Sequence, residues 1–596
     1  MVQVAAGDAN IRRAMTLARH GGDAVARTLA AAGIRHVFTL VGGHISPLLV
    51  GAKDHGLQVI DVRDERNAVF AADAVARMTG LPGVAAVTAG PGVTNTLTAL
   101  KNAQLAQSPV ILFGGATATV LKGRGALQDI DQLALVASSV KWMARCTTVA
   151  QLAPAVKRAV RESTSGVPGP VFIEVPVDVL YPESIVQEWF IKEAGLSNPR
   201  TLQQKALKLY LSGHLYRQFH VPHVDVRASA PELKLPRVRL SAQLDKAAEL
   251  LRGAQRPAIV VGSQTLVNSQ APERVAAALK KLGAPTWLGG MARGLLGRDG
   301  EVQYRHARGK ALKEADVAVV CGFPFDFRLK YGLGFGKDTK VIAANLSTEE
   351  LTKNRTPELA LRMHPGEFLE GLARRVRGAR DWSAWHRACR QREDARDQEI
   401  RGKAKTGGEL VDPLQFFLRL EEKLADDSVL VADGGDFVAT AAYILKPRRP
   451  LSWLDPGVFG TLGVGGGFAA GAAAVRPKSE VWIIYGDGSS AYSLAEFDTF
   501  VRHGMAPIAV IGTDASWAQI ARDQVTLLGS DVATTLLRTD YQKVAEGYGG
   551  VGLLLTDPAK IDETLDEAKR IAKSGKPVCV NVHIAKTDFR EGSISI

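Results

Sequence analysis

Residues 481–490 read VWIIYGDGSS, and this stretch indicates how the chain around it folds. Its five leading apolar residues predict a buried strand that ends at a Gly-Asp-Gly turn, and Leu494, Phe497 and Phe500 predict a helix after the turn. Glycines let a backbone approach an anion closely, and free N–H groups at a helix start favour negative charge. The stretch therefore predicts an α/β unit with a diphosphate-binding turn. The candidate phosphate-binding residues are Gly486, Gly488 and Ser489.

Two aspartates stand at the ends of neighbouring apolar runs. Asp487 lies in the turn, and Asp514 follows the next apolar run, residues 508–512. A carboxylate beside a diphosphate needs a hard cation between them, and Mg²⁺ takes one or two carboxylates together with phosphate oxygens. We expect Asp487, Asp514 and the main-chain carbonyl of Ser516 to bind Mg²⁺. A Gly-Asp-Gly triplet alone is also an ordinary turn with a solvated aspartate, so the second aspartate favours the metal site.

Short apolar runs alternate with amphipathic segments in three parts of the chain. Near-continuous runs of Val, Ile and Leu indicate parallel strands that are covered on both faces. The runs are residues 37–41, 59–62, 84–88, 110–113 and 171–175, then 257–262, 315–321 and 341–345, then 428–432, 481–485, 508–512 and 578–584. We predict three consecutive parallel-sheet α/β domains, at residues 1–183, 240–380 and 408–596.

Two linkers are expected between these domains. Residues 184–239 combine Trp189, Phe190, a helical Leu/Tyr stretch and several prolines. A surface helix followed by an extended strap is the favoured interpretation, and a membrane-binding or partner-binding face is the alternative. Residues 381–407 are rich in charge and helix-like, which predicts a solvated connection.

The length of the chain fits a large multidomain enzyme, because 596 residues predict three or four domains. The net charge is +13, but basic residues are scattered among acidic ones without interleaved aromatics. This pattern argues against nucleic acid as a partner and favours an anionic small molecule or a general surface effect. No apolar run reaches the roughly 18 residues of a membrane span, and the N-terminal residues lack a signal-peptide pattern. We expect a cytoplasmic protein whose four widely spaced cysteines are reduced core residues.

Several segments in chain order resemble thiamine diphosphate enzymes of the acetolactate synthase branch. The segments are residues 65–80, 88–95, 433–436, 459–463 and 486–490 with Asp514. In one place the chain departs from the family, which usually carries Asn-Asn where this sequence has Thr513-Asp514. The departure keeps an oxygen ligand and adds a charge, so metal binding is still expected.

This resemblance implies roles for individual residues. Glu65 is implied to be the carboxylate at N1′ of the cofactor's aminopyrimidine, although composition alone would make it a helix-starting acid. The carbonyl of Gly460 is implied to hold N4′, and Leu462 to wedge the cofactor into its V shape. Gln128 stands where the family places an active-site glutamine. The loop implied to reach the diphosphate from the other side contains Gly435 and Asp436.

Within this branch the chain is similar to the 2-hydroxyacyl-CoA lyases from about residue 20 to residue 596. The segments that carry this likeness are residues 40–47, 289–298, 514–520 and 587–593. The implied reaction cleaves a 2-hydroxyacyl-CoA to formyl-CoA and an aldehyde one carbon shorter. Acetolactate synthesis from a 2-oxo acid is the alternative, but Gln519 and Asp523 replace the Met and Trp that shape the acceptor pocket of those synthases. A non-catalytic regulatory relative is a further alternative.

Three features stay open at this point. His44 follows a Gly-Gly turn at a strand end, and proton transfer with the substrate hydroxyl and a hydrogen-bonded loop histidine are equally plausible roles. Relatives hold FAD or an ADP moiety in the middle domain, but no pattern in residues 262–264 or 322–328 assigns either. The resemblance also implies a homodimer or homotetramer with active sites shared between subunits.

Overall fold

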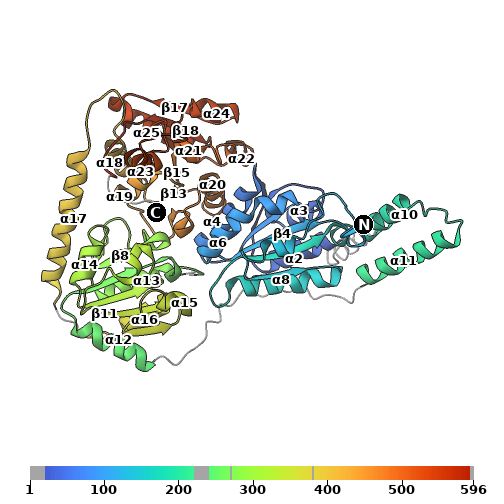
Figure 1. Ribbon diagram of the computed structural model, residues 1–596, viewed down its shortest axis with the longest axis horizontal. Coiled ribbons are helices and arrows are strands. Elements are labelled where there is room, and N and C mark those ends of the chain that lie inside the picture. The colour runs from blue at the N-terminus through green and yellow to red at the C-terminus, as the bar shows by residue number, and fades with distance from the viewer. Residues whose placement is uncertain (1–19, 221–240, 269–270, 379–380, 591–596) are drawn as a thin grey trace, which may run out of the picture. The chain divides into compact units, whose positions relative to one another are not determined.

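The computed structural model describes residues 20–220, 241–268, 271–378 and 381–590 (Figure 1). Three six-stranded sheets follow one another along the chain, and the strand pairings within them are parallel. The predicted fold class is therefore confirmed. The first sheet lies in one compact unit, and the other two lie in a second unit. The exact domain boundaries given above stay predictions.

The sheet of the first unit has the strand order β2-β1-β3-β4-β6-β5. Its central strand β4 (Val110–Ala116) is buried along its whole length, as expected for a strand covered on both faces. Helices α2 (Gly21–Ala31), α3 (Ser46–Asp54) and α8 (Val149–Thr164) contribute apolar side chains to the core on one face. The other strands are β1 (His36–Leu40), β2 (Gln58–Asp61), β3 (Gly83–Val87), β5 (Trp142–Arg145) and β6 (Val171–Pro176). The other helices of this part are α4 (Glu65–Thr79), α5 (Pro91–Asn95), α6 (Leu97–Leu105), α7 (Gln132–Val136) and α9 (Val177–Leu180).

The first sheet of the second unit has the order β12-β11-β10-β7-β8-β9. Alternate residues of β10 (Val317–Cys321) enter two different cores, Val319 on one face and Val320 on the other. The other strands are β7 (Pro257–Val261), β8 (Thr286–Leu288), β9 (Gln303–Tyr304), β11 (Lys340–Asn345) and β12 (Leu359–Arg362). Its helices are α12 (Ser241–Gly253), α13 (Pro272–Leu282), α14 (Arg308–Glu314), α15 (Thr348–Thr352) and α16 (Pro365–Arg375).

The last sheet has the order β14-β13-β15-β16-β18-β17. Strand β15 (Val481–Gly486) lies between β13 (Val429–Ala432) and β16 (Ile508–Thr513), so the loops after these three strands meet at one edge. The remaining strands are β14 (Trp453–Leu454), β17 (Val551–Leu555) and β18 (Val578–His583). Its helices are α18 (Pro413–Lys423), α19 (Asp436–Ile444), α20 (Val464–Val475), α21 (Asp487–Ser490), α22 (Glu496–Arg502), α23 (Ala518–Leu528), α24 (Tyr541–Gly547) and α25 (Ile561–Lys573).

The two predicted linkers both contain helices. In the first, α10 (Glu183–Glu193) and α11 (Leu202–Phe219) form a helical hairpin, visible in Figure 1, whereas the predicted strap lies largely outside the described residues. In the second, α17 (Ser383–Lys403) buries Trp385 and Cys389 in the core of the middle sheet. The segment is helical, as predicted, but the prediction of a solvated connection was wrong for one side of α17, which packs on that sheet.

Two expectations from composition can be compared with the structure. All four cysteines are buried and unpaired, as predicted. Among the described residues, none of the helices is both long enough and apolar enough to cross a membrane.

Candidate functional site

The turn after β15 begins the helix α21, as the sequence predicts. Asp487 is buried, and its Oδ1 accepts a hydrogen bond of 2.8 Å from the N–H of Gly488. The Oγ of Ser489 donates to the Gly486 carbonyl and accepts from the Gly486 N–H, both at 3.1 Å. A Cβ at Gly488 would lie 2.5 Å from the ring of Trp517, so the turn has no room for a side chain there. The backbone thus forms a tight turn at a strand end.

Asp514 stands beside Asp487 at the end of β16. The Oδ2 of Asp487 accepts 2.8 Å from the N–H of Ala515, and the Oδ1 of Asp514 accepts 3.1 Å from the N–H of Ser516. Burial, followed by the charge of Asp487, raises the pKa of Asp514 to about 7, and burial raises the pKa of Asp487. Two neighbouring carboxylates, Asp487 buried and Asp514 half-buried, both with raised pKa values, fit a hard divalent cation, because a cation would remove the repulsion between them.

The loops after β13 and before α20 face the same turn. The buried carboxylate of Asp433 accepts 2.9 Å from the N–H of Gly463 and 2.6 Å from the N–H of Gly465, and burial raises its pKa to about 7. A Cβ at Gly434 would lie 2.3 Å from Leu462. Asp433 therefore ties the loop that carries Leu462 to the end of β13.

Three further predicted residues lie in these loops. Gly435 has φ of +109° and Gly460 has φ of +64°, conformations that glycine adopts most readily. A Cβ at Gly435 would lie 3.9 Å from Gly486, so these two backbones run close together. The side chain of Asp436 pairs with Arg522, and Arg590 lies 3.7 Å away. The backbone of this loop, rather than the Asp436 carboxylate, is therefore available to a diphosphate.

Glu65 begins α4 in the first unit. Its side chain is buried, with 7% of its surface exposed, and its Oε2 accepts 3.0 Å from Nδ2 of Asn95. Asn95 ends α5, in the segment after β3 that resembles the thiamine diphosphate enzymes. A buried carboxylate with one amide partner keeps acceptor capacity for a second group.

His44 and Gln128 also lie near the segment after β3. Nδ1 of His44 is 3.1 Å from Oγ1 of Thr88, and burial lowers the pKa of His44. Gln128 has φ of +63°, and its Cβ would be 2.9 Å from a Cβ built on Gly90. His44, Glu65 and Gln128 thus lie in the segments that follow the carboxyl ends of β1, β2 and β4.

One residue of this network was not predicted. Gln132 is buried, and its Oε1 accepts 2.9 Å from the N–H of Gly90. Its Nε2 donates 3.0 Å to the Gly115 carbonyl and 3.0 Å to Glu174, whose carboxylate also pairs with Arg145. Gln132 therefore fixes the turn against which Gln128 packs. No sequence pattern distinguishes it, because its partners are distant in the chain.

A cavity of about 1260 Å³ lies in the second unit. Its wall includes Gly434, Gly435, Gly460 and Leu462, and it is also strongly basic. The basic side chains in the wall are Arg293, Arg305, Arg308, Lys310, Lys313, Arg328, Lys330, Arg396 and Lys446. The predicted cofactor loops and a positive surface therefore share one cavity.

Cations in this cavity are crowded. The guanidinium of Arg308 lies 5.5 Å from the ring centre of Phe323, and that of Arg328 lies 4.5 Å from it. Burial and the charges of Arg328 and Arg293 lower the pKa of Arg308. Clustered guanidinium groups with an aromatic ring suit a ligand that carries phosphates and a planar base.

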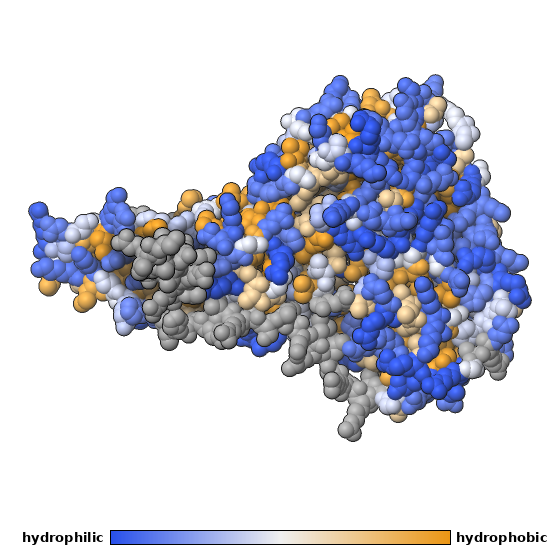
Figure 2. Space-filling view, turned by 180° about the vertical axis from the view of Figure 1, so that it is seen from behind, coloured by the Kyte–Doolittle hydropathy of each residue, from blue (hydrophilic) through white to orange (hydrophobic). Residues whose placement is uncertain are grey.

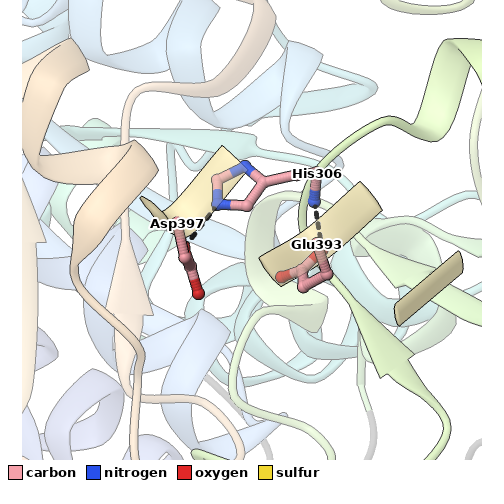
Figure 3. Close-up of side chains that lie close together, drawn as sticks. All are labelled: His306, Glu393 and Asp397. Carbon is pink, nitrogen blue, oxygen red and sulfur yellow. Dashed lines mark hydrogen bonds and ion pairs between the residues drawn. The ribbon is translucent and has the colours of Figure 1, made fainter. Parts of the chain in front are cut away.

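His306, Glu393 and Asp397 form a further cluster of possible metal ligands (Figure 3). Both oxygens of Glu393 already accept main-chain N–H groups of Arg305 and His306, at 2.8 to 3.2 Å. Asp397 lies 3.1 Å from Nε2 of His306 and 2.9 Å from Nη2 of Arg305. Because Arg305 supplies a positive charge, this cluster is a closed ionic network that fastens α17 to the loop after β9.

Three known domain families match this chain, in the same order as its three sheets. Residues 19–135 match the N-terminal TPP binding domain of thiamine pyrophosphate enzymes, residues 244–372 match the central domain, and residues 433–582 match the C-terminal TPP binding domain. The chain belongs to the thiamine pyrophosphate enzyme family. The two TPP-binding matches confirm thiamine diphosphate as the predicted cofactor.

Members of the thiamine pyrophosphate enzyme family resemble this chain over nearly its full length. It is 47% identical to 2-hydroxyacyl-CoA lyase 2 of Danio rerio, over 97% of this chain and 94% of the relative. It is 46% identical to 2-hydroxyacyl-CoA lyase 2 of Homo sapiens, over 97% and 92%. It is 33% identical to a probable acetolactate synthase of Mycobacterium bovis, over 94% and 95%.

Proposed function

We propose that this protein is a thiamine diphosphate- and Mg²⁺-dependent lyase that cleaves 2-hydroxyacyl-CoA to formyl-CoA and an aldehyde one carbon shorter. The observation that carries the proposal is the 46–47% identity to proteins named 2-hydroxyacyl-CoA lyase 2, against 33% to an acetolactate synthase. The basic cavity supports an acyl-CoA substrate, because coenzyme A carries several phosphates and an adenine, whereas pyruvate carries one carboxylate.

In this proposal the second unit holds the diphosphate end of the cofactor. Asp487, Asp514 and the carbonyl of Ser516 bind Mg²⁺, while the turn of Gly486, Gly488 and Ser489 binds the phosphates. The raised pKa values of these two neighbouring carboxylates support the metal site. The carbonyl of Gly460 would accept a hydrogen bond from the cofactor's amino group, and Leu462 would support its rings.

The first unit supplies the groups that move protons. Thiamine diphosphate, when bound, supplies a nucleophilic carbon that adds to a carbonyl and then stores the electron pair of the broken bond. Glu65 holds the proton at N1′ of the pyrimidine. Because burial lowers the pKa of His44, its imidazole is neutral at pH 7 and can accept the proton of the substrate hydroxyl. Gln128 hydrogen-bonds the substrate.

The test is product identification with purified protein, thiamine diphosphate and Mg²⁺. We expect formyl-CoA and the shortened aldehyde from a 2-hydroxyacyl-CoA, and no more than a trace of acetolactate from pyruvate. Acetolactate as the main product would establish the synthase alternative. Turnover of neither substrate by protein that binds the cofactor would establish a regulatory relative.

A further inference from the structure

Helix α11 is apolar on two opposite faces. On one face, Leu211 and Leu215 are buried against Val186 and Phe190 of α10. Nε2 of His214 is 2.9 Å from the hydroxyl of Thr119. These contacts fix the rotation of α11 about its axis, so the direction of its other face is set by packing.

The other face carries an outer stripe, which we define as Leu202, Ala206, Leu209, Gly213 and Tyr216. These residues are spaced by four and three positions, so they lie along one side of the helix. All five are exposed, and the exposed fractions of Leu202, Leu209 and Tyr216 are 86%, 75% and 59%. A helix that only covers its own unit would carry polar residues on this side.

Within α11, the charged side chains all have one sign. Between Leu202 and His220 the chain contains no Asp or Glu, whereas Lys205, Lys208 and Arg217 are basic. Lys205 and Arg217 are exposed next to the stripe. Figure 2 shows hydrophobic and hydrophilic residues side by side on the hairpin, at the end of the first unit. Apolar residues flanked by cations are typical of helices that lie on anionic membranes.

We propose that the outer stripe of α11 docks this protein on an anionic lipid surface. The leucines would enter the acyl boundary, while Tyr216, Lys205 and Arg217 would lie at the level of the headgroups. A second copy of the chain fits less well, because a two-fold pairing of stripes would bring positive side chains together. The inference does not rest on the proposed reaction, since membrane binding can be measured without turnover.

The experiment is flotation of the full-length protein with vesicles of phosphatidylcholine plus about one-third phosphatidylserine, compared with phosphatidylcholine alone. We expect the protein to float with the anionic vesicles only. The double variant Leu202→Gln/Leu209→Gln should reduce the bound fraction by at least about tenfold, because two leucine side chains no longer enter the bilayer. Lys205→Gln/Arg217→Gln should reduce binding to the anionic vesicles by about tenfold.

The matched control is Leu207→Gln, which removes the same side chain from the same helix outside the outer stripe. It should bind vesicles as the unmodified protein does, and circular dichroism should show all variants folded. The proposal is overturned if the unmodified protein stays unbound, or if the stripe variant binds equally well. It is also overturned if the stripe variant forms a smaller oligomer, since the stripe would then contact a second copy.

Discussion

Glu65 is the residue on which the proposed chemistry depends most directly. Replacing it with glutamine keeps the size and the Asn95 contact but removes the group that shares a proton with N1′. We expect Glu65→Gln to fold, to bind thiamine diphosphate and to lose activity by at least about 100-fold. Deuterium exchange at C2 of the bound cofactor, followed by NMR, measures the step itself. Deuterium exchange at the rate of the unmodified protein would show that a group other than Glu65 promotes loss of the C2 proton. The control is Glu183→Gln, a substitution at an exposed glutamate.

Asp487 and Asp514 are expected to act on cofactor affinity. Alanine at either position removes a carboxylate from the metal site, so the protein should need at least about tenfold more Mg²⁺ to bind thiamine diphosphate. Calorimetric titration of the cofactor at several Mg²⁺ concentrations measures the effect. The exposed Asp426→Ala is the control. An unchanged Mg²⁺ requirement in both site variants would point to different ligands.

Asp514 also predicts a pH dependence. Its pKa rises from 3.8 to about 7 in the folded protein, so between these values the folded state holds a proton that the unfolded chain has released. Without metal, this carboxyl therefore lowers the free energy of unfolding as pH rises through that window, and the loss is complete above about pH 7. Mg²⁺ should bind more weakly at about pH 6 than at about pH 8, because it must displace the proton.

Asp514→Asn tests this pH dependence. The amide keeps an oxygen ligand and cannot titrate, so Mg²⁺ affinity should become nearly constant between about pH 6 and pH 8. Without metal, the variant should melt at a higher temperature than the unmodified protein at about pH 8, and the difference should vanish near pH 4. Parallel pH profiles of the two proteins would contradict the assignment of the titrating group.

Among the elements, the buried strands could be predicted from the sequence. Every apolar run that predicts a strand overlaps one in the structure, because strands covered on both faces need continuous apolar residues. The missed strands are β5, β8, β9, β12, β14 and β17. Most of these lie at sheet edges, where β5 and β17 are partly exposed, and β9 and β14 contain two residues each. Such strands are defined by their neighbour rather than by their own composition.

The same distinction holds for the candidate site. The turn of Asp487 could be predicted because a strand, a turn and a helix are contiguous in sequence. The contacts of Gln132 and Asp433 could not be predicted, because their partners are distant in sequence. The partners of Gln132 are 17 to 42 positions away, and those of Asp433 are 30 to 32 positions away. The buried face of α17 was missed because charged residues surround its few apolar ones.

The tight packing of the turn at α21 predicts that a side chain at Gly488 destabilises the protein. Gly488 has a helical backbone, so alanine there adds no backbone strain, but its Cβ would meet the Trp517 ring at 2.5 Å. We expect Gly488→Ala to lower the free energy of unfolding by about 1–3 kcal/mol and to change Trp517 fluorescence. Gly547→Ala is the control, because a Cβ in that helix meets nothing within 4 Å. Equal stabilities of the two variants would show that Trp517 moves freely.

At the scale of the whole molecule, we predict a homodimer or homotetramer whose sites combine Glu65 of one subunit with Asp487 of another. Glu65→Gln and Asp487→Ala are each expected to be inactive. Dissociating and reassociating a mixture of the two should restore about one quarter of the unmodified activity, because half of randomly formed dimers are mixed and each contains one intact site.

Native mass spectrometry must show that mixed dimers form, and unmodified protein carried through the same treatment must recover. Mixed dimers without activity would mean that each subunit builds its own site.

In the part of the chain that the structure describes, each of the three sheets is built from strands that are consecutive in sequence, and no strand is exchanged between sheets. During synthesis, the strands of each sheet can therefore pair before the strands of the next sheet have emerged from the ribosome. The residues proposed to hold the two ends of the cofactor are encoded near opposite ends of the gene, with the metal ligands last. A chain that ended after β12 would contain the strands of the first two sheets but lack the metal ligands, so translation of the last sheet is itself a condition for chemistry.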